Sequence, residues 1–75
     1  MNLNEVKLNA NCVVKSVNIL DELTKIRIME LGIIRNVNII VKHKSLLKKT
    51  LLVVFNNSCF TLKENFAKSI EVLYA

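Results

Sequence analysis

The sequence predicts a small, mainly β barrel with one helix inserted after the first strand and a short helix before the last strand. Three observations lead to this fold class. The chain has 75 residues, so one small domain spans residues 1–75. Hydrophobic residues make up 52% of the chain but aromatic residues only 5%, so the core is aliphatic. Short apolar runs alternate with polar turn residues, and a small closed barrel leaves few strand edges unpaired in such a set.

The first strand is expected over Asn11–Ile19. This stretch mixes β-branched residues with polar ones, a pattern typical of strands. The alternation slips at Lys15-Ser16, which predicts a bulge or kink there.

A helix is expected over Asp21–Leu31. The carboxylate of Asp21 can accept from free N–H groups at its start, and Glu22 suits the positive end of the helix dipole. Gly32 follows where a helix end favours a left-handed residue. The residues expected to be buried are Leu23, Ile28, Met29 and Leu31, and those expected to face water are Lys25, Arg27 and Glu30.

The second half of the chain is expected to consist mostly of strands. Ile33–Lys42 holds two strand signals around Arg35-Asn36, and His43–Lys49 reads as a basic loop that carries Leu46 and Leu47. The further elements are strands over Val37–Val41, Thr50–Phe55, Ser58–Leu62 and Ile70–Leu73, a turn at Asn56-Asn57, and one or two helical turns over Lys63–Ser69 with Phe66 and Ala67 inward.

The motifs of catalysis and cofactor binding are absent from the sequence. One glycine cannot build a glycine-rich phosphate loop, and no nucleophile elbow or dinucleotide fingerprint occurs. Cys12 and Cys59 are expected to be reduced, buried thiols that pack as small hydrophobic residues, and the single His43 is expected to be exposed. Two cysteines and one histidine do not supply the four ligands at characteristic spacings that a structural zinc site needs. We therefore expect no enzyme activity, no cofactor, no built-in metal site and no small-molecule substrate.

The charge is positive and unevenly distributed. The net charge is +5, and no acidic residue lies between Glu30 and Glu64. This balance favours anionic partners without naming one. Nucleic acid is the less favoured partner, because aromatic residues that could stack on bases do not interleave with the lysines. The lysines of the loop region are Lys42, Lys44, Lys48 and Lys49, and the aromatic residues are Phe55, Phe60, Phe66 and Tyr74.

Two further features concern surfaces and membranes. Leu51–Phe55 and Ile39–Val41 are apolar on both strand faces, so either a protein interface or a covering segment lies over them. The longest strictly apolar run, Leu51–Phe55, is far shorter than the ~18 residues of a membrane span. The first residues lack the pattern of a signal peptide, so a cytoplasmic location is expected.

Three segments together resemble the ferrous iron transport protein A (FeoA) family. The first matches its helix-to-glycine signature, a basic–x–basic–apolar–x–x–Leu–Gly–apolar pattern, and the others match its opening and closing segments. The matching residues are Lys25, Arg27, Ile28, Leu31, Gly32 and Ile33 in the signature, Val6-Lys7, Val14 and Val17 near the start, and Leu62-Lys63, Ala67, Ile70 and Val72 near the end.

The departures from the family pattern predict local backbone conformation. Asn9, Asn36 and Asn57 stand where the family usually has glycine, and asparagine tolerates the left-handed region best among residues with a side chain. A shared backbone with asparagine in place of glycine accounts for this. Arg35 replaces a proline, and the loop over 43–49 replaces a loop that contains proline and glycine.

The resemblance implies an SH3-like barrel in a small cytosolic accessory protein of bacterial ferrous iron uptake. It implies protein–protein interaction with the cytosolic GTP-binding part of the membrane iron transporter, with recruitment to the inner face of the membrane and no enzyme activity. A homodimer is a further possibility. The candidate contacts, chosen for exposure and charge, are Arg27, Glu30, Lys42, Lys44, Leu46 and Leu47.

Two other functions remain open at this point. A basic barrel that binds nucleic acid through the lysine loop would lose affinity steeply with salt. An Fe²⁺-responsive sensor or carrier would use Cys12, His43 and Cys59 as ligands.

Overall fold

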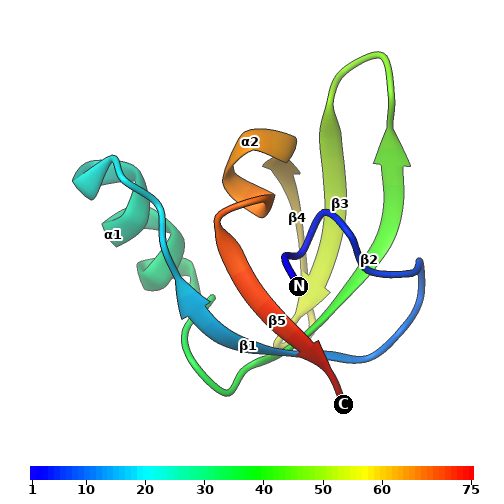
Figure 1. The fold of residues 1–75 in the computed structure, drawn as a ribbon, viewed down its shortest axis with the longest axis horizontal. Helices are drawn as coiled ribbons and strands as arrows, with labels where there is room; N and C mark the ends of the chain where they lie inside the picture. The colour runs from blue at the N-terminus through cyan, green and yellow to red at the C-terminus, as the bar shows by residue number, and fades with distance from the viewer.

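Five antiparallel strands form one sheet that curls around an aliphatic core (Figure 1). A computed structural model describes residues 1–75. The sheet order is β4-β3-β2-β1-β5. The elements are β1 (Cys12–Val17), α1 (Glu22–Leu31), β2 (Asn38–Ser45), β3 (Thr50–Phe55), β4 (Ser58–Lys63), α2 (Glu64–Ala67) and β5 (Ile70–Tyr74). The predicted element order and mainly β class are confirmed.

Two bulges allow the small sheet to curl. On β1 the register against β5 shifts between Val14 and Ser16, where the sequence predicts a bulge. On β2 the register against β3 shifts between Val41 and His43. An extra residue bends a strand and increases its twist. β2 therefore pairs with β1 near its start and with β3 over its later part.

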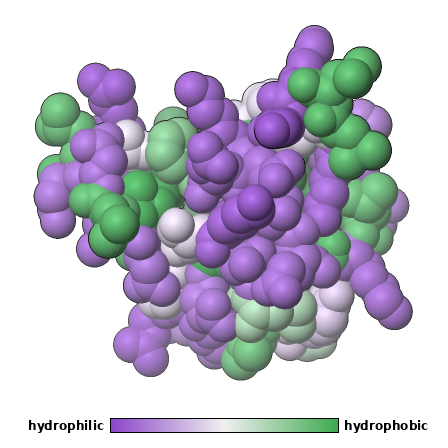
Figure 2. Space-filling view, turned by 45° about the horizontal axis from the view of Figure 1, so that its top comes forward, coloured by the Kyte–Doolittle hydropathy of each residue, from purple (hydrophilic) through white to green (hydrophobic).

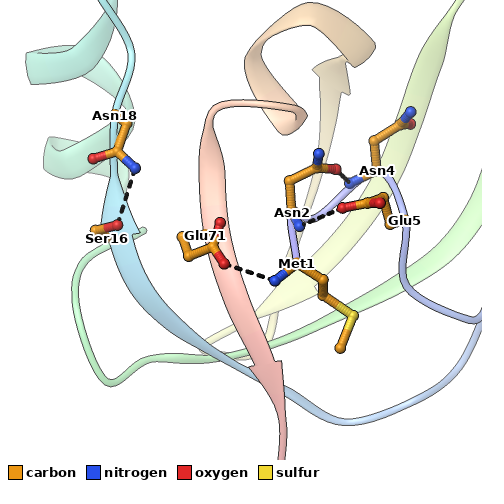
Figure 3. A network of polar contacts seen from close by, with 7 residues as sticks. All are labelled: Met1, Asn2, Asn4, Glu5, Ser16, Asn18 and Glu71. Atoms are coloured by element: carbon orange, nitrogen blue, oxygen red, sulfur yellow. Dashed lines mark hydrogen bonds and ion pairs between the residues drawn. The ribbon is translucent and has the colours of Figure 1, made fainter.

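The two edge strands of the sheet, β5 and β4, have different neighbours. The N-terminal segment pairs with the outer edge of β5: the N–H of Leu3 donates to the carbonyl of Ile70 at 2.9 Å, and the N–H of Val72 donates to that of Met1 at 2.8 Å. The terminal ammonium group also lies 2.6 Å from the carboxylate of Glu71 (Figure 3). At the seam of the barrel, α2 joins β4 to β5.

The core is entirely apolar. All 17 buried residues are hydrophobic, and no polar side chain is buried. Along β3, Leu51, Val53 and Phe55 point inward, while the alternating Leu52 and Val54 are half-buried on the outer face. Ala67 is buried as predicted, and Phe66 packs against the core. The sequence left open whether a protein interface or a covering segment lies over the outer face of β3. The structure shows this face partly covered by the chain itself and partly exposed.

The asparagines that replace glycine adopt left-handed conformations. φ is +67° at Asn9, +74° at Asn36 and +60° at Asn57. Asn56 is also left-handed, so both residues of the β3–β4 turn have positive φ. This is the pattern of hairpin turns whose twist matches the flanking strands. The prediction that asparagine takes over the role of glycine is confirmed.

The ends of α1 are as predicted, but its burial is not. The N–H of Thr24 donates to the Asp21 carboxylate at 3.2 Å, and Gly32 ends the helix with φ +112°. The predicted stripe is wrong, because α1 buries only Ile28 and leaves the other three members of the stripe exposed. Five residues span about 140° around a helix, so Leu23 cannot share a face with Ile28. The exposed members are Leu23, Met29 and Leu31.

Three smaller predictions also need correction. The expected loop over 43–49 is shorter, because β2 continues to Ser45 and pairs with β3. No strand forms over 33–37, where Val37 donates its N–H to the carbonyl of Ile34 in a turn. Cys12 is buried, but Cys59 is exposed because its side chain points to the outer face of the last strand of the β2–β3–β4 meander.

Candidate functional site

Apolar side chains gather at several places on the surface, and two of these places include leucines that are mostly exposed (Figure 2). One lies over α1, and the other at the turn between β2 and β3, on the opposite side of the molecule (Figure 1). We call the first the helical patch (Leu23, Ile26, Arg27 and Glu30) and the second the hairpin tip (Leu46, Leu47, Lys48 and Lys49). Figure 2 also shows apolar side chains at the bottom of the view, and hydrophilic residues over most of the remaining surface.

The helical patch occupies one face of α1. Its four residues follow the spacing i, i+3, i+4, i+7, which brings side chains together on a helix. The side chain of Leu23 is 67% exposed and that of Ile26 47%. Ile28 on the opposite side is the one residue of α1 that enters the core. The patch therefore combines two unpartnered apolar side chains with a positive and a negative charge.

The sequence contained a signal for this exposure. Arg27 and Glu30 were expected to face water, and helical spacing places Leu23 and Ile26 beside them. Either two charges enter the core or two apolar residues leave it, and the second arrangement costs far less free energy. Leu20, just before the helix, is also 97% exposed and was not singled out by the sequence.

The hairpin tip projects beyond the body of the barrel. Leu46 is 88% exposed and Leu47 98% exposed, at the apex of the connection from β2 to β3. The N–H of Lys48 donates to Oγ of Ser45 at 3.3 Å, and Lys49 adopts a left-handed φ of +52°. The carbonyl of Lys49 accepts from the N–H of Glu64 at 2.9 Å. These contacts define a turn in which neither leucine folds back onto the core.

Lysines surround a small polar hollow at the base of the tip. Its volume is about 170 Å³ and no hydrophobic residue lines it. Its one acidic residue, Glu64, forms an ion pair with Lys68 at 3.2 Å, so the lysines of the hollow have no acidic partner. The lining residues are Lys48, Lys49, Thr50, Lys63, Glu64 and Asn65.

A second hollow continues from the first across the outer face of the meander. Its volume is about 310 Å³, and it shares Lys48 and Thr50 with the first. Its remaining lining residues are His43, Ser45, Leu52 and Thr61. The exposed position of His43 agrees with the prediction from the sequence.

The structure divides the predicted contact residues between the two surfaces. Arg27 and Glu30 belong to the helical patch, and Leu46 and Leu47 to the hairpin tip. Lys42 is exposed on β2. The ammonium group of the half-buried Lys44 donates to the main-chain carbonyl of Asn4, so this lysine holds the N-terminal segment against β2.

The ligand set of the metal-sensor alternative is not assembled. No group of three or more His, Cys, Asp or Glu side chains lies close enough together to hold a metal ion. Cys12 is in the core, and its burial raises the pKa of its thiol above the ordinary 9.0. Cys59 and His43 lie on the surface of β4 and β2.

The aromatic residues form no platform for stacking bases on the basic hairpin. Phe55 and Phe60 stack on each other with ring centroids 5.3 Å apart. The hydroxyl of Tyr74 accepts from the N–H of Lys7 at 3.0 Å, where it ties the N-terminal segment to β5.

Neither helix has the length and apolar character that are needed to cross a bilayer.

Comparisons with known proteins agree with this fold. The model of the FeoA domain matches residues 1–73. A Campylobacter jejuni protein assigned as Fe(2+) transport protein A is 38% identical over 72 residues, which is 96% of each chain.

Two solved structures are also similar. FeoA from Stenotrophomonas maltophilia, solved with zinc and described as an SH3 domain protein, has a TM-score of 0.85 and 29% identity, over 97% of this chain and 89% of that one. FeoA from Chlorobium tepidum has a TM-score of 0.87 and 28% identity, over 99% of this chain and 70% of that one. The curled five-stranded sheet, the helix after β1 and these matches together show that the chain belongs to the FeoA family of ferrous iron transport and has its SH3-like fold.

Proposed function

We propose that this protein is a non-enzymatic, cytosolic accessory protein that docks on the cytosolic GTP-binding part of the membrane ferrous iron transporter. Membership of the FeoA family supports the link to iron transport. The helical patch supports docking, because it exposes apolar side chains that no other element of the chain covers. This exposure is the observation that carries the proposal.

The helical patch has the chemistry of a helix that fits into a groove of a partner. Apolar residues at i and i+3 anchor such helices, and charges beside them set orientation. Leu23 and Ile26 are the anchors, and Arg27 and Glu30 supply the charges. Because α1 buries only Ile28 against its own core, docking would bury apolar surface without disturbing the barrel.

Docking changes the activity of a partner only when affinity differs between two states of that partner. The GTP-binding part of a transporter has such states, with and without bound nucleotide. We infer that the helical patch binds one nucleotide state more tightly than the other and so shifts the population between them. The protein then acts without any chemistry of its own.

The test is a titration of the purified full chain into the cytosolic domain of its host's ferrous iron transporter. It is measured with and without guanine nucleotide at physiological salt. Saturable binding that changes with nucleotide supports the proposal. The variant Leu23→Gln/Ile26→Gln should weaken binding at least about tenfold, since buried interface anchors each contribute 1 kcal/mol or more. Leu73→Gln on β5 is the matched control, because Leu73 is 49% exposed and lies outside the patch.

Two results would contradict the proposal. Absence of binding in both nucleotide states removes this partner, and binding that Leu23→Gln/Ile26→Gln leaves unchanged removes the helical patch. Reversing charges with Arg27→Glu should weaken binding and change its dependence on salt. Light scattering over a range of protein concentrations shows whether a second copy of the chain occupies the same patch.

A further inference from the structure

We propose that the hairpin tip, together with the lysine-lined hollow at its base, is a contact for an anionic lipid bilayer. The hollow is the one of about 170 Å³ lined by Lys48, Lys49 and Lys63 among others. This inference does not depend on the identity of the protein partner, because it concerns the opposite side of the molecule from the helical patch (Figure 1). It replaces the expectation that the loop residues contact the transporter protein.

The apolar part of the contact is the pair Leu46 and Leu47. They are 88% and 98% exposed and are adjacent at the apex of a hairpin. The bond from Lys48 N–H to Ser45 Oγ stabilises the turn, and Lys49 completes it with a left-handed φ of +52°. Apolar side chains held at a convex end can enter the headgroup and acyl boundary of a bilayer while the rest of the domain stays in water.

The charged part of the contact lies beside the leucines. Lys48 and Lys49 follow Leu47 directly, and Lys63 lies beside them in the hollow. No acidic residue of the hollow is free to neutralise them, since Glu64 is paired with Lys68. Thr50 and Asn65 add uncharged polar groups. An ammonium group is a point charge that suits phosphate, so this set fits the phosphate of an acidic lipid headgroup.

The arrangement favours a bilayer over a protein groove or a second copy. Two leucines at a convex apex need no shaped pocket in a fluid surface, whereas a protein partner must provide one. A second copy would bring equal positive charge against the same lysines, in a chain with net charge +5. Neither two leucines nor a few lysines alone hold a protein on a membrane, but the two signals combined give weak, reversible binding.

The test uses the full chain and sedimentation with vesicles. One vesicle population contains phosphatidylglycerol and phosphatidylethanolamine, and the other contains neutral phosphatidylcholine alone. We expect partition onto the anionic vesicles only, weakened by salt as the Debye length falls. Lys48→Gln/Lys49→Asn and, separately, Leu46→Asn/Leu47→Asn should each lower this partition by at least about tenfold.

Matched controls separate the tip from general charge and hydrophobicity. Lys7→Gln/Lys15→Gln removes two exposed charges elsewhere, and Leu20→Asn removes a leucine that is 97% exposed elsewhere. Each control should keep most of the partition, and thermal melting checks that every variant is folded.

Four results would overturn the proposal. These are absence of binding to anionic vesicles, equal binding to neutral ones, unchanged binding of both tip variants, and full displacement by millimolar inorganic phosphate, which would assign the hollow to a free anion. Since the vesicles contain no transporter, failure here leaves the docking of the helical patch standing, and failure of that docking leaves this result standing.

Discussion

Gly32 and Asn56 lie so close together that a Cβ on Gly32 would be 3.0 Å from Nδ2 of Asn56. Gly32 ends α1, and Asn56 is in the turn between β3 and β4. Helix and hairpin therefore meet at a point where no side chain fits without strain. The end of α1 therefore lies beside the β3–β4 turn.

Replacing Gly32 should destabilise the protein. Gly32→Ala places a Cβ at φ +112°, a conformation that alanine rarely adopts, and brings it within 3.0 Å of Nδ2 of Asn56. The expected loss in free energy of unfolding is about 1–3 kcal/mol, measured by urea denaturation. An unchanged midpoint with an unchanged fold would show that the helix end relaxes freely. Thr24→Ala, inside the helix, is a milder comparison.

Substitutions at Asn36 should depend on backbone conformation rather than on side-chain contacts. Asn36 has φ +74°, and its N–H donates to the carbonyl of Val14 at 2.8 Å. Asn36→Gly should be nearly neutral, whereas Asn36→Val should cost about 1–2 kcal/mol because a β-branched residue tolerates the left-handed region poorly. Thermal melting of the two variants side by side measures the difference. Equal stabilities would mean that the turn changes its conformation.

Truncating a leucine of the core should destabilise the protein, whereas truncating a leucine of the hairpin tip should leave its stability nearly unchanged. Leu51→Ala removes a residue that is 1% exposed and should cost about 2–5 kcal/mol. Leu47→Ala removes one that is 98% exposed and should change stability by less than about 0.5 kcal/mol. Urea denaturation gives both values. A large loss on truncating Leu47 would place it in a core and contradict its role at a membrane surface.

The two thiols should differ in reactivity. Burial shields Cys12 and raises the pKa of its thiol, while Cys59 is exposed. A maleimide at neutral pH should modify Cys59 at once and Cys12 only after unfolding, as mass spectrometry can measure; Cys59→Ser should abolish the fast reaction. Rapid labelling of Cys12 would indicate an opening core.

Because the folded-state pKa of Cys12 is raised, the contribution of this thiol to the free energy of unfolding is complete below pH 9.0 and is lost as pH rises through the folded pKa.

Local features of the chain could be predicted from short-range physics. Asp21 and Gly32 mark the ends of α1 because a side-chain carboxylate and a left-handed glycine satisfy free backbone groups there. The asparagines at 9, 36 and 57 mark left-handed positions, and the slip at Lys15-Ser16 marks the bulge of β1. Each of these depends only on residues a few positions apart.

Burial and the shape of the surface depended on contacts between distant parts of the chain. The burial of Ile28 instead of Leu23, the continuation of β2 to Ser45 and the exposure of Cys59 depend on which strand lies beside each segment. The same is true of the separation of Arg27 and Glu30 from the hairpin tip.

The sequence by itself thus determined the order of the elements, the two ends of α1, the left-handed positions and the family. Only the tertiary structure decided which apolar residues stay outside. The reason is physical: an apolar residue gains free energy from any neighbour that excludes water, so its local pattern does not specify whether its own core or another surface supplies that neighbour.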